Sequence, residues 1–193
     1  MRDIAIGTSV IRIHRGDVTM LGRRVGAIVS PATEDLQPGT GVRGAIHEFG
    51  GPEVSVECRW IGRVATGRAV ATTAGRLLAD CIIHAVGPIW EGGNRDEDRL
   101  LASAYRSALE IAADRGLSTV AFPSLSTGLF SFPPERSATI AVGTCAAFLK
   151  RGVSIEEVIL VATTEDERYA YDLAGDRLER MQASRMAQVH AMR

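Results

Sequence analysis

Residues 118–152 read STVAFPSLSTGLFSFPPERSATIAVGTCAAFLKRG, and this stretch contains one complete unit of the fold. Its first six residues are mostly apolar and partly β-branched, which predicts a short strand. A loop of small hydroxyl residues follows, and apolar residues then recur at helical spacing over 133–152. Pro133 and Pro134 suit a helix start, and Gly152 suits a helix end. The stretch therefore predicts a strand, a loop and a helix in this order.

Short apolar segments and helical patterns alternate along the rest of the chain as well. The short segments are rich in Val and Ile and are bounded by Gly, Pro or Asp, as strands are. This alternation predicts an α/β fold, a three-layer sandwich with a largely parallel sheet, in one domain over 1–182. Residues 183–193 show no clear pattern, and we expect this tail to fray. The predicted strands are 9–14, 25–30, 68–73, 80–86, 118–123 and 157–163, and the predicted helices are 42–49, 52–60, 96–116, 133–152 and 165–181.

The composition is that of one ordinary globular domain. Of the 193 residues, 46% are hydrophobic and 23% are charged. With 22 Lys and Arg against 23 Asp and Glu, the chain lacks the basic excess of a protein that grips nucleic acid through its phosphates. The N-terminus has no signal-peptide core, and no stretch approaches a membrane span in length. We therefore expect a cytoplasmic protein that contacts no membrane and has no general nucleic-acid binding.

The cysteines and histidines give no local signal for a metal, a disulfide or a cofactor. They lie far apart in the sequence and lack the ligand spacing of zinc sites, so we expect no metal and no cofactor. Ligands that the fold brings together stay open as an alternative. The residues concerned are Cys58, Cys81, Cys145, His14, His47, His84 and His190.

Residues 39–44 read GTGVRG and match the glycine fingerprint of dinucleotide-binding folds. Three further features of that motif are missing. The preceding strand ends near Ser30, with eight residues between it and Gly39. The following helix is interrupted at Gly50 and Gly51, and the next strand ends without an acidic residue for a ribose. The match to an NAD site is therefore accidental, which leaves a surface turn or another phosphate-binding loop.

A second loop of the same kind favours a ligand over a turn. Residues 124–133, SLSTGLFSFP, follow a predicted strand and precede a helix. Ligands of open α/β sheets bind beyond the carboxyl ends of the strands, where backbone N–H groups can converge on phosphate oxygens. Two such loops suit an elongated ligand that carries phosphates. Of the two aromatic residues here, Phe130 and Phe132, we expect one to pack in the core.

Six motifs, in order, resemble the macrodomain family in its MacroD-like branch, and the resemblance covers about residues 9–180. It implies a mixed central sheet between helices and a cleft that binds ADP-ribose or an ADP-ribosylated macromolecule. The motifs are RGDVTML (15–21), VGAIVS (25–30), GTGVRGAIHEFGGPEV (39–54), ATGRAVATTAGRL (65–77), CIIHAVGPIW (81–90) and VAFPSLSTGLFSFPPERSATIA (120–141).

The resemblance also implies roles for individual residues. Asp17, with Val18 beside it, matches the aspartate that accepts a hydrogen bond from the adenine amino group; from the residues alone, Asp17 could equally cap a short helix through Leu21. His84 matches a family position too, but its apolar strand predicts a hydrogen-bonded core histidine without a catalytic role. The distal-ribose loop is matched by Gly39, Thr40, Gly41 and Val42, and the diphosphate loop by Ser126, Thr127, Gly128, Leu129 and Phe130.

The sequence departs from the family pattern at the expected catalytic groups. MacroD-like hydrolases usually carry Asn-Ala-Ala-Asn after the second strand, where this chain has Ser-Pro-Ala-Thr ending at Thr33. They carry Asp where this chain has Arg43, and a guanidinium can act neither as a base nor as an acceptor. Thr163 stands where many members have an aromatic residue that stacks on adenine. Thr33 is nevertheless a candidate ligand-binding residue.

These departures leave two classes of function open. The first is an ADP-ribosyl hydrolase or O-acetyl-ADP-ribose deacetylase with a non-standard site, in which Glu34 or Asp35 supplies a carboxylate and Arg43 stabilises negative charge. We favour this class, although Glu34 and Asp35 could simply be solvated loop charges. The second class is a reader that binds ADP-ribose without chemistry. A weaker third hypothesis, motivated by Thr163, is a binder of another nucleotide.

Overall fold

The computed structural model describes residues 1–191, with the side chains of 185, 186 and 189–191 left out. Its centre is a seven-stranded sheet in the order β1-β2-β7-β6-β3-β5-β4. The two outer pairs, β1 with β2 and β5 with β4, are antiparallel, and all other neighbours are parallel. The strands are β1 (Arg2–Ile6), β2 (Ser9–Arg15), β3 (Val25–Ala32), β4 (Ala69–Thr73), β5 (Ala79–Val86), β6 (Thr119–Pro123) and β7 (Glu157–Ala162).

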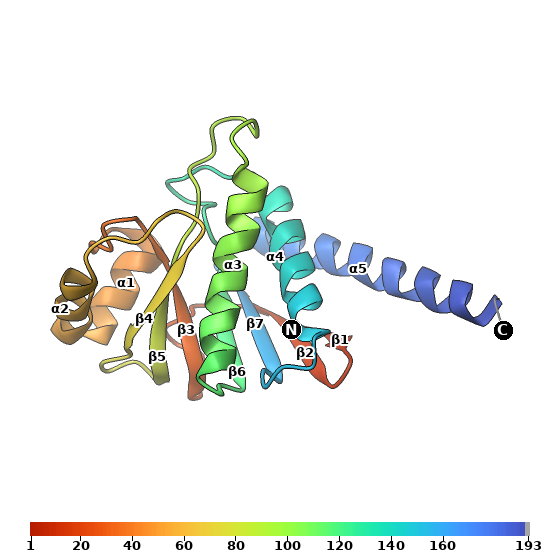
Figure 1. Ribbon diagram of the computed structural model, residues 1–193, viewed down its shortest axis with the longest axis horizontal. Coiled ribbons are helices and arrows are strands. Elements are labelled where there is room, and N and C mark those ends of the chain that lie inside the picture. The colour runs from red at the N-terminus through yellow and green to blue at the C-terminus, as the bar shows by residue number, and fades with distance from the viewer. Residues whose placement is uncertain (192–193) are drawn as a thin grey trace.

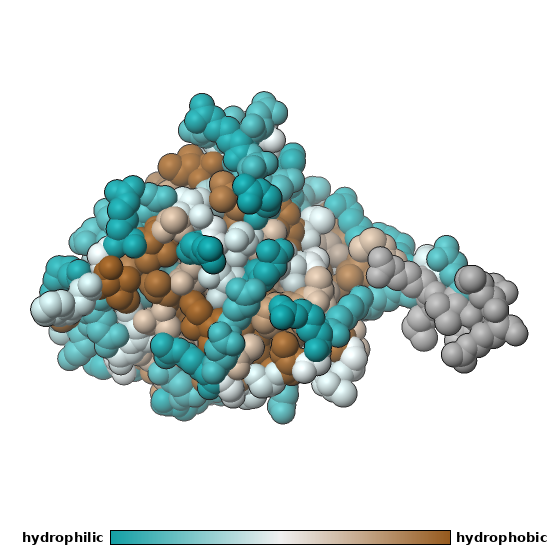
Figure 2. All heavy atoms as spheres, in the orientation of Figure 1, coloured by the Kyte–Doolittle hydropathy of each residue, from teal (hydrophilic) through white to brown (hydrophobic). Residues whose placement is uncertain are grey.

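Helices cover both faces of the sheet, as Figure 1 shows, and this confirms the predicted three-layer α/β sandwich. One layer consists of α1 (Gly41–Gly50) and α2 (Pro52–Ile61). The other consists of α3 (Glu97–Asp114), α4 (Pro134–Leu149) and α5 (Glu165–Ala191). Hydrophilic and hydrophobic side chains are interspersed over the face seen in Figure 2, and hydrophilic ones cover the uppermost loop. Within residues 1–191, no helix is both long and apolar enough to cross a membrane.

The central strands are buried on both faces of the sheet, because a separate hydrophobic core covers each face. Along β7, Val158 and Leu160 pack beneath α3, α4 and α5, whereas Ile159 and Val161 belong to the core under α1 and α2. Side chains of a strand alternate between the two faces, so a strand that is apolar at every position must be covered twice. The unbroken apolar run of this strand was therefore a reliable sign of a central position.

The structure adds one strand and lengthens one helix relative to the sequence prediction. β1 was not predicted, because this short edge strand buries only Ile4 and Ile6 and begins with two charged residues. The helix predicted over 165–181 continues to Ala191 and extends beyond the sheet in Figure 1. The fraying expected for 183–193 stays a prediction, and residues 192–193 lie outside the described part. The other predicted elements agree to within a few residues.

The topology brings five loops to one edge of the sheet. Five neighbouring strands, β2, β7, β6, β3 and β5, run parallel, so all of their carboxyl ends lie on the same side. Both predicted loops are among those at this edge: 33–40 follows β3 and 124–133 follows β6, which is its neighbour in the sheet. Segments separated by some ninety residues in the chain thus meet at one site.

Candidate functional site

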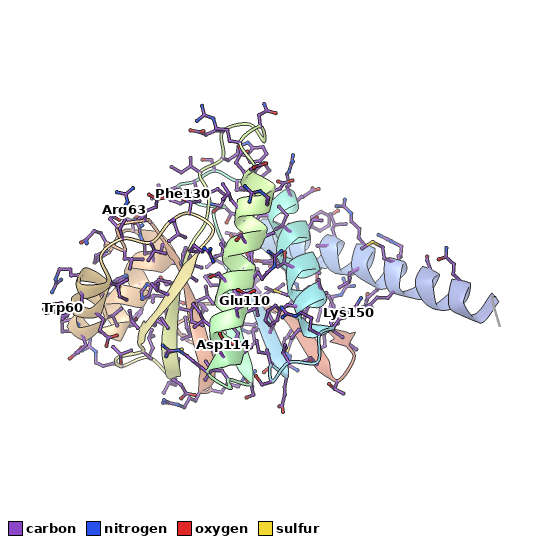
Figure 3. All side chains as sticks on the ribbon, in the orientation of Figure 1. Trp60, Arg63, Glu110, Asp114, Phe130 and Lys150 are labelled. Carbon is purple, nitrogen blue, oxygen red and sulfur yellow. The ribbon has the colours of Figure 1, made fainter. Side chains whose placement is uncertain are left out.

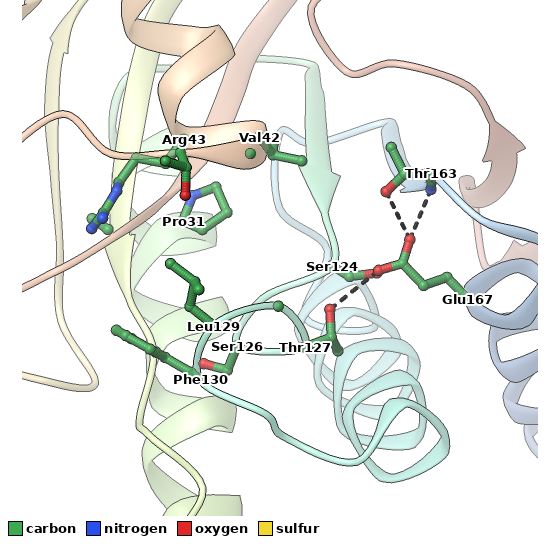
Figure 4. A pocket seen from close by; sticks show the side chains of 14 residues that line it. Pro31, Val42, Arg43, Ser124, Ser126, Thr127, Leu129, Phe130, Thr163 and Glu167 are labelled. Carbon is green, nitrogen blue, oxygen red and sulfur yellow. Dashed lines mark hydrogen bonds between the residues drawn. The ribbon is translucent and has the colours of Figure 1, made fainter.

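A cavity of about 480 Å³ lies where these loops meet, and Figure 4 shows it from close by. It extends from the start of α1, across the loop that follows β6, to the start of α5. The cavity lies at the carboxyl ends of parallel strands, where open α/β sheets usually bind their ligands. The lining residues are Pro31, Ala32, Thr40, Gly41, Val42, Arg43, Ser124, Ser126, Thr127, Gly128, Leu129, Phe130, Thr163 and Glu167.

The start of α1 lines one end of the cavity. Thr40 precedes the helix without a side-chain cap, and the first turn contains no acidic residue, so its N–H groups and positive dipole end stay available to an anion. Gly41 begins the helix at a φ of 63°, a left-handed conformation that favours glycine. A side chain on Gly44 would collide with the carbonyl oxygen of Gly39. The glycine pattern therefore serves close packing of this loop on its helix.

The loop that follows β6 is strained and lines the middle of the cavity. Ser126 and Ser131 have left-handed backbones, with φ of 65° and 53°. The loop bonds to itself, since Phe132 N–H donates to the Ser126 carbonyl oxygen at 2.9 Å. Ser126 lines the cavity, and its hydroxyl is buried beside Gly87 without a hydrogen-bond partner in the described chain. Phe132 is buried and Phe130 lines the cavity, which confirms that one of the two phenylalanines packs in the core.

The loop between β5 and α3 supports the loop that follows β6. Trp90 N–H donates to the Phe130 carbonyl oxygen at 2.9 Å, and the Trp90 ring packs on Phe132 with centroids 4.8 Å apart. The guanidinium carbon of Arg136 in α4 lies over the Trp90 ring, 5.1 Å from its centroid, and both carboxylate oxygens of Asp98 bind this guanidinium. Trp90 is thus a support for the cavity that spacing arguments did not predict.

Glu97 holds that supporting loop in shape. Only 2% of this residue is exposed, and its carboxylate accepts hydrogen bonds from the N–H groups of Glu91, Gly93 and Arg95. Burial opposes ionisation of the carboxyl, but these backbone donors outweigh it and lower the pKa of Glu97 to about 2. The negative charge also lies in the first turn of α3, where the helix dipole favours it.

At the other end of the cavity, Glu167 connects two of the loops. Its carboxylate accepts hydrogen bonds from the N–H and hydroxyl of Thr163 and from the Thr127 hydroxyl, as Figure 4 shows. Sequence reasoning missed Glu167. The pattern Thr164-x-x-Glu167 at the helix start is typical of a capping box and places the glutamate in the first turn beside the strand end.

Asp17 and Val18 lie outside the lining of this cavity. Asp17 accepts hydrogen bonds from Thr19 N–H at 2.8 Å and from the Thr19 hydroxyl at 2.7 Å, and Met20 N–H bonds back to the Asp17 carbonyl oxygen. The alternative in which Asp17 caps a helix through Leu21 is wrong, because these bonds form a turn and no helix follows. Val18 is buried in the core under α1 and α2. The adenine contact of Asp17 stays a prediction.

Arg43, in the first turn of α1, contacts the loop that follows β3. Arg43 Nη1 donates to the Thr33 hydroxyl at 2.7 Å, and that hydroxyl donates to Asp35 at 2.6 Å. The Arg43 Nε atom is buried without an acceptor in the described chain, and the guanidinium lies against Gly39. The pKa of Asp35 is lowered mainly by the hydrogen bond from the Thr33 hydroxyl and, to a smaller extent, by the one from Gln37 N–H.

Glu34 contacts Thr66 and Arg63 instead of Arg43. Its carboxylate accepts hydrogen bonds from the N–H and hydroxyl of Thr66, and it also pairs with Arg63; these contacts lower the pKa of Glu34. Glu34 and Asp35 line a second cavity of about 410 Å³ and are not among the lining residues of the first. Thr33 also lines the second cavity, and Arg43 alone lines both.

The fold does bring three scattered cysteine and histidine residues together. The ligand-type atoms of His47, Cys58 and His84 all lie within 4.8 Å of one another, and all three residues are buried. His84 Nε2 lies 2.9 Å from the Thr72 hydroxyl and 3.6 Å from Cys58 Sγ, so His84 is hydrogen-bonded in the core as predicted. Burial lowers the pKa of His84 to about 3 and raises that of Cys58 to about 11. The buried His84 Nδ1 has no hydrogen-bond partner in the described chain, and none of the three residues lines either cavity.

We predict that Glu97→Gln destabilises the protein in a pH-dependent way. Because the pKa falls from an ordinary 4.5 to about 2 on folding, the ionised carboxylate contributes stability that is complete above pH 4.5 and is lost as the pH falls toward 2. At neutral pH the variant should lower Tm by roughly 5 °C. Thermal scans of both proteins should show this difference shrinking below pH 4.5; a constant difference would mean that the charge of Glu97 is unimportant.

Comparisons with known proteins agree with this geometry. The Macro domain family model matches residues 29–141. A macro domain-containing protein of Methanosarcina mazei is 46% identical over 156 residues, covering 81% of this chain and 82% of the relative. An Enterobacter cloacae protein named O-acetyl-ADP-ribose deacetylase is 42% identical over 165 residues, covering 83% of this chain and 91% of the relative.

Solved structures show the same arrangement of elements. The Oceanobacillus iheyensis macrodomain with ADP superposes with a TM-score of 0.88 at 32% identity, covering 93% of this chain and 97% of that one. The Trypanosoma brucei macrodomain in complex with ADP-ribose has a TM-score of 0.77 at 33% identity, covering 83% of this chain and 67% of that one. Sequence motifs, sheet order and cleft position thus lead to one conclusion: the chain belongs to the macro domain family.

Proposed function

We propose that this protein binds ADP-ribose in the main cavity and hydrolyses esters of its distal ribose, as an ADP-ribosyl hydrolase or an O-acetyl-ADP-ribose deacetylase. The observation that carries the proposal is the pairing of the open N-terminus of α1 with the unpartnered Ser126 hydroxyl across one elongated cavity. Uncharged donors of this kind suit a diphosphate. Relatives named O-acetyl-ADP-ribose deacetylase and neighbours solved with ADP or ADP-ribose support it.

The chemistry requires a water, a group that accepts its proton, and donors for the oxyanion. Water adds to the acyl carbonyl carbon, the bond from that carbon to the ribose oxygen breaks, the ribose oxygen takes up a proton to become a hydroxyl, and the acid leaves as a carboxylate. In our proposal Arg43, which lines the main cavity, stabilises the negative charge on the acyl oxygen. Thr33 and Asp35 hold the guanidinium in place.

The lowered pKa values of Glu34 and Asp35 make both carboxylates weak bases. Neither carboxylate lines the main cavity, so our preferred acceptor for the proton of water is a phosphate oxygen of the bound substrate, which lies in that cavity in our proposal. The same weakness favours the alternative function, a reader that binds ADP-ribose without chemistry. A binder of another nucleotide stays our third hypothesis, because Thr163 cannot stack on a base and Glu167 adds a carboxylate at the end of the cavity near α5.

Two measurements separate these functions. Calorimetric titration with ADP-ribose tests binding, and the release of ADP-ribose from modified protein, modified nucleic acid and its O-acetyl ester tests hydrolysis. We expect heat of binding and turnover of at least one ester. Binding without turnover of any linkage would leave the reader, whereas no heat at millimolar ADP-ribose would defeat both.

We predict that Ser126→Ala weakens ADP-ribose without loss of stability. A hydrogen bond to a charged phosphate contributes about 1.5–3 kcal/mol, so the Kd should rise roughly tenfold or more. Removing a buried hydroxyl that has no partner costs the folded protein nothing, and Tm should stay the same or rise. Calorimetry and thermal scans check both parts. An unchanged Kd would show that this hydroxyl does not contact the ligand.

We predict that Gly128→Val folds normally and blocks binding. Gly128 lines the cavity, its φ is not left-handed, and an added Cβ meets no atom within 4 Å, so the new side chain fills space that the ligand needs. Gly143→Val is the matched control, because this exposed glycine of α4 has equally free surroundings and lies outside the cavity. The Kd should rise at least tenfold in the first variant only, by roughly 1.4 kcal/mol or more. Equal affinities in the two variants would contradict the proposed position of the diphosphate.

We predict that Arg43→Ala lowers kcat on the hydrolysed ester by roughly 100-fold, the usual effect of losing one oxyanion donor. Arg43→Lys should recover only part of the rate, because a lysine cannot reproduce the planar fork that binds Thr33. Rates at saturating substrate check this, together with those of Asp35→Asn and Glu34→Gln. Should all of these variants keep the wild-type rate, the proposed catalytic set would be abandoned.

A further inference from the structure

The two charged residues that line the main cavity lie at its opposite ends. Arg43 is in the first turn of α1, and Glu167 is in the first turn of α5, as Figure 4 shows. The other described residues of the lining are uncharged. The first turn of α1 has no acidic residue, whereas that of α5 has three, Glu165, Asp166 and Glu167. The α1 end of the cavity therefore suits an anion, and the α5 end disfavours one.

The hydrogen bonds of Glu167 leave the α5 end of the cavity rich in acceptors. Its carboxylate accepts hydrogen bonds from Thr163 N–H at 2.8 Å, from the Thr163 hydroxyl at 2.8 Å and from the Thr127 hydroxyl at 3.1 Å. A hydroxyl has one proton, so neither threonine hydroxyl can donate to a ligand while these bonds persist. Both hydroxyls and the carboxylate keep lone pairs. A ligand group that meets them must therefore supply the donor.

Among the described residues, no cation forms an ion pair with Glu167. Arg15 at the end of β2 is paired with Glu165 at 2.8 Å and does not line the cavity. The chain has a single lysine, Lys150, which follows the end of α4. Figure 3 shows Lys150 well away from Phe130, which lines the cavity. A phosphate group beside Glu167 would thus meet a carboxylate whose charge no neighbouring cation neutralises.

The position of Glu167 indicates which part of the ligand it would meet. In our proposed function the diphosphate lies along the loop that follows β6, and the distal ribose lies near Arg43. Thr127 belongs to that loop and is bonded directly to Glu167. On the side away from Arg43, the group that follows the diphosphate is the ribose of the adenosine. Its hydroxyls are donors that suit a carboxylate, as in dinucleotide sites, where an acidic residue binds the 2′ hydroxyl and an arginine accommodates a 2′-phosphate.

We propose that Glu167 makes the main cavity selective for ADP-ribose without a phosphate on its adenosine ribose. The inference rests on the proposed function and names its substrate class as ADP-ribose derived from NAD rather than from NADP. The carboxylate accepts a hydrogen bond from a hydroxyl of that ribose and repels a 2′-phosphate. Thr163 and Thr127 hold the carboxylate in place.

The test measures by calorimetry the Kd of ADP-ribose and of its 2′-phosphorylated form. In the wild-type protein the 2′-phosphate should raise the Kd roughly tenfold or more. Glu167→Gln should reduce this ratio to about threefold or less, because an amide of similar shape can bond to both threonines without the charge. Asp166→Asn is the matched control, since Asp166 is an exposed carboxylate of the same turn outside both cavities, and it should keep the wild-type ratio.

A third ligand separates charge from size. ADP-ribose with a 2′-O-methyl group has added bulk without charge, so the wild-type protein should bind it more tightly than the 2′-phosphate. Equal losses for the two would show exclusion by size and overturn the role of Glu167. Should Glu167→Gln fail to fold in thermal scans, this comparison in the wild-type protein decides alone.

The remaining outcomes separate this selectivity from the proposed function. Equal Kd values for ADP-ribose and its 2′-phosphate, or a ratio that is unchanged in Glu167→Gln, would overturn the selectivity and leave the proposed function intact. A failure of ADP-ribose itself to bind would instead overturn the proposed function, and the selectivity with it.

Discussion

The parallel direction of five neighbouring strands is the constraint from which the site follows. A sheet of this kind must be covered on both faces, and the two cores formed by alternate residues of β6 and β7 meet that requirement. The same direction places the ends of β3, β6 and β7 side by side. The position of the cavity therefore follows from the strand directions alone. Changes in its loops can alter the chemistry while the sheet stays the same.

The sequence predicted those parts of the fold whose signal is local. Strands that are apolar at every position and helices with proline and glycine at their ends were found to within a few residues. The edge strand β1 was missed because two buried isoleucines give too short a pattern. Whether Phe130 or Phe132 enters the core could not be decided from alternation, since it depends on Trp90, which lies forty residues away in the chain.

In the candidate site, too, the sequence predicted features with a local signal and missed those that depend on contacts between distant residues. Loops rich in glycine and serine could be identified in the sequence, and the family resemblance gave them an order. The contacts of Thr33, Asp35 and Glu34 depend on the path of one irregular loop, which no periodicity describes. Glu97 is a further example, because a carboxylate that binds three backbone N–H groups looks in the sequence like any charged residue at a helix start.

The three hydrogen bonds that Glu97 accepts hold the loop beside the main cavity in shape over a wide range of pH. The pKa of about 2 leaves Glu97 fully charged at neutral and mildly acidic pH. Among the described residues, no histidine or cysteine lines either cavity, and the pKa values of Glu34 and Asp35 are lowered as well. Around neutral pH, these parts of the protein therefore keep one fixed charge state.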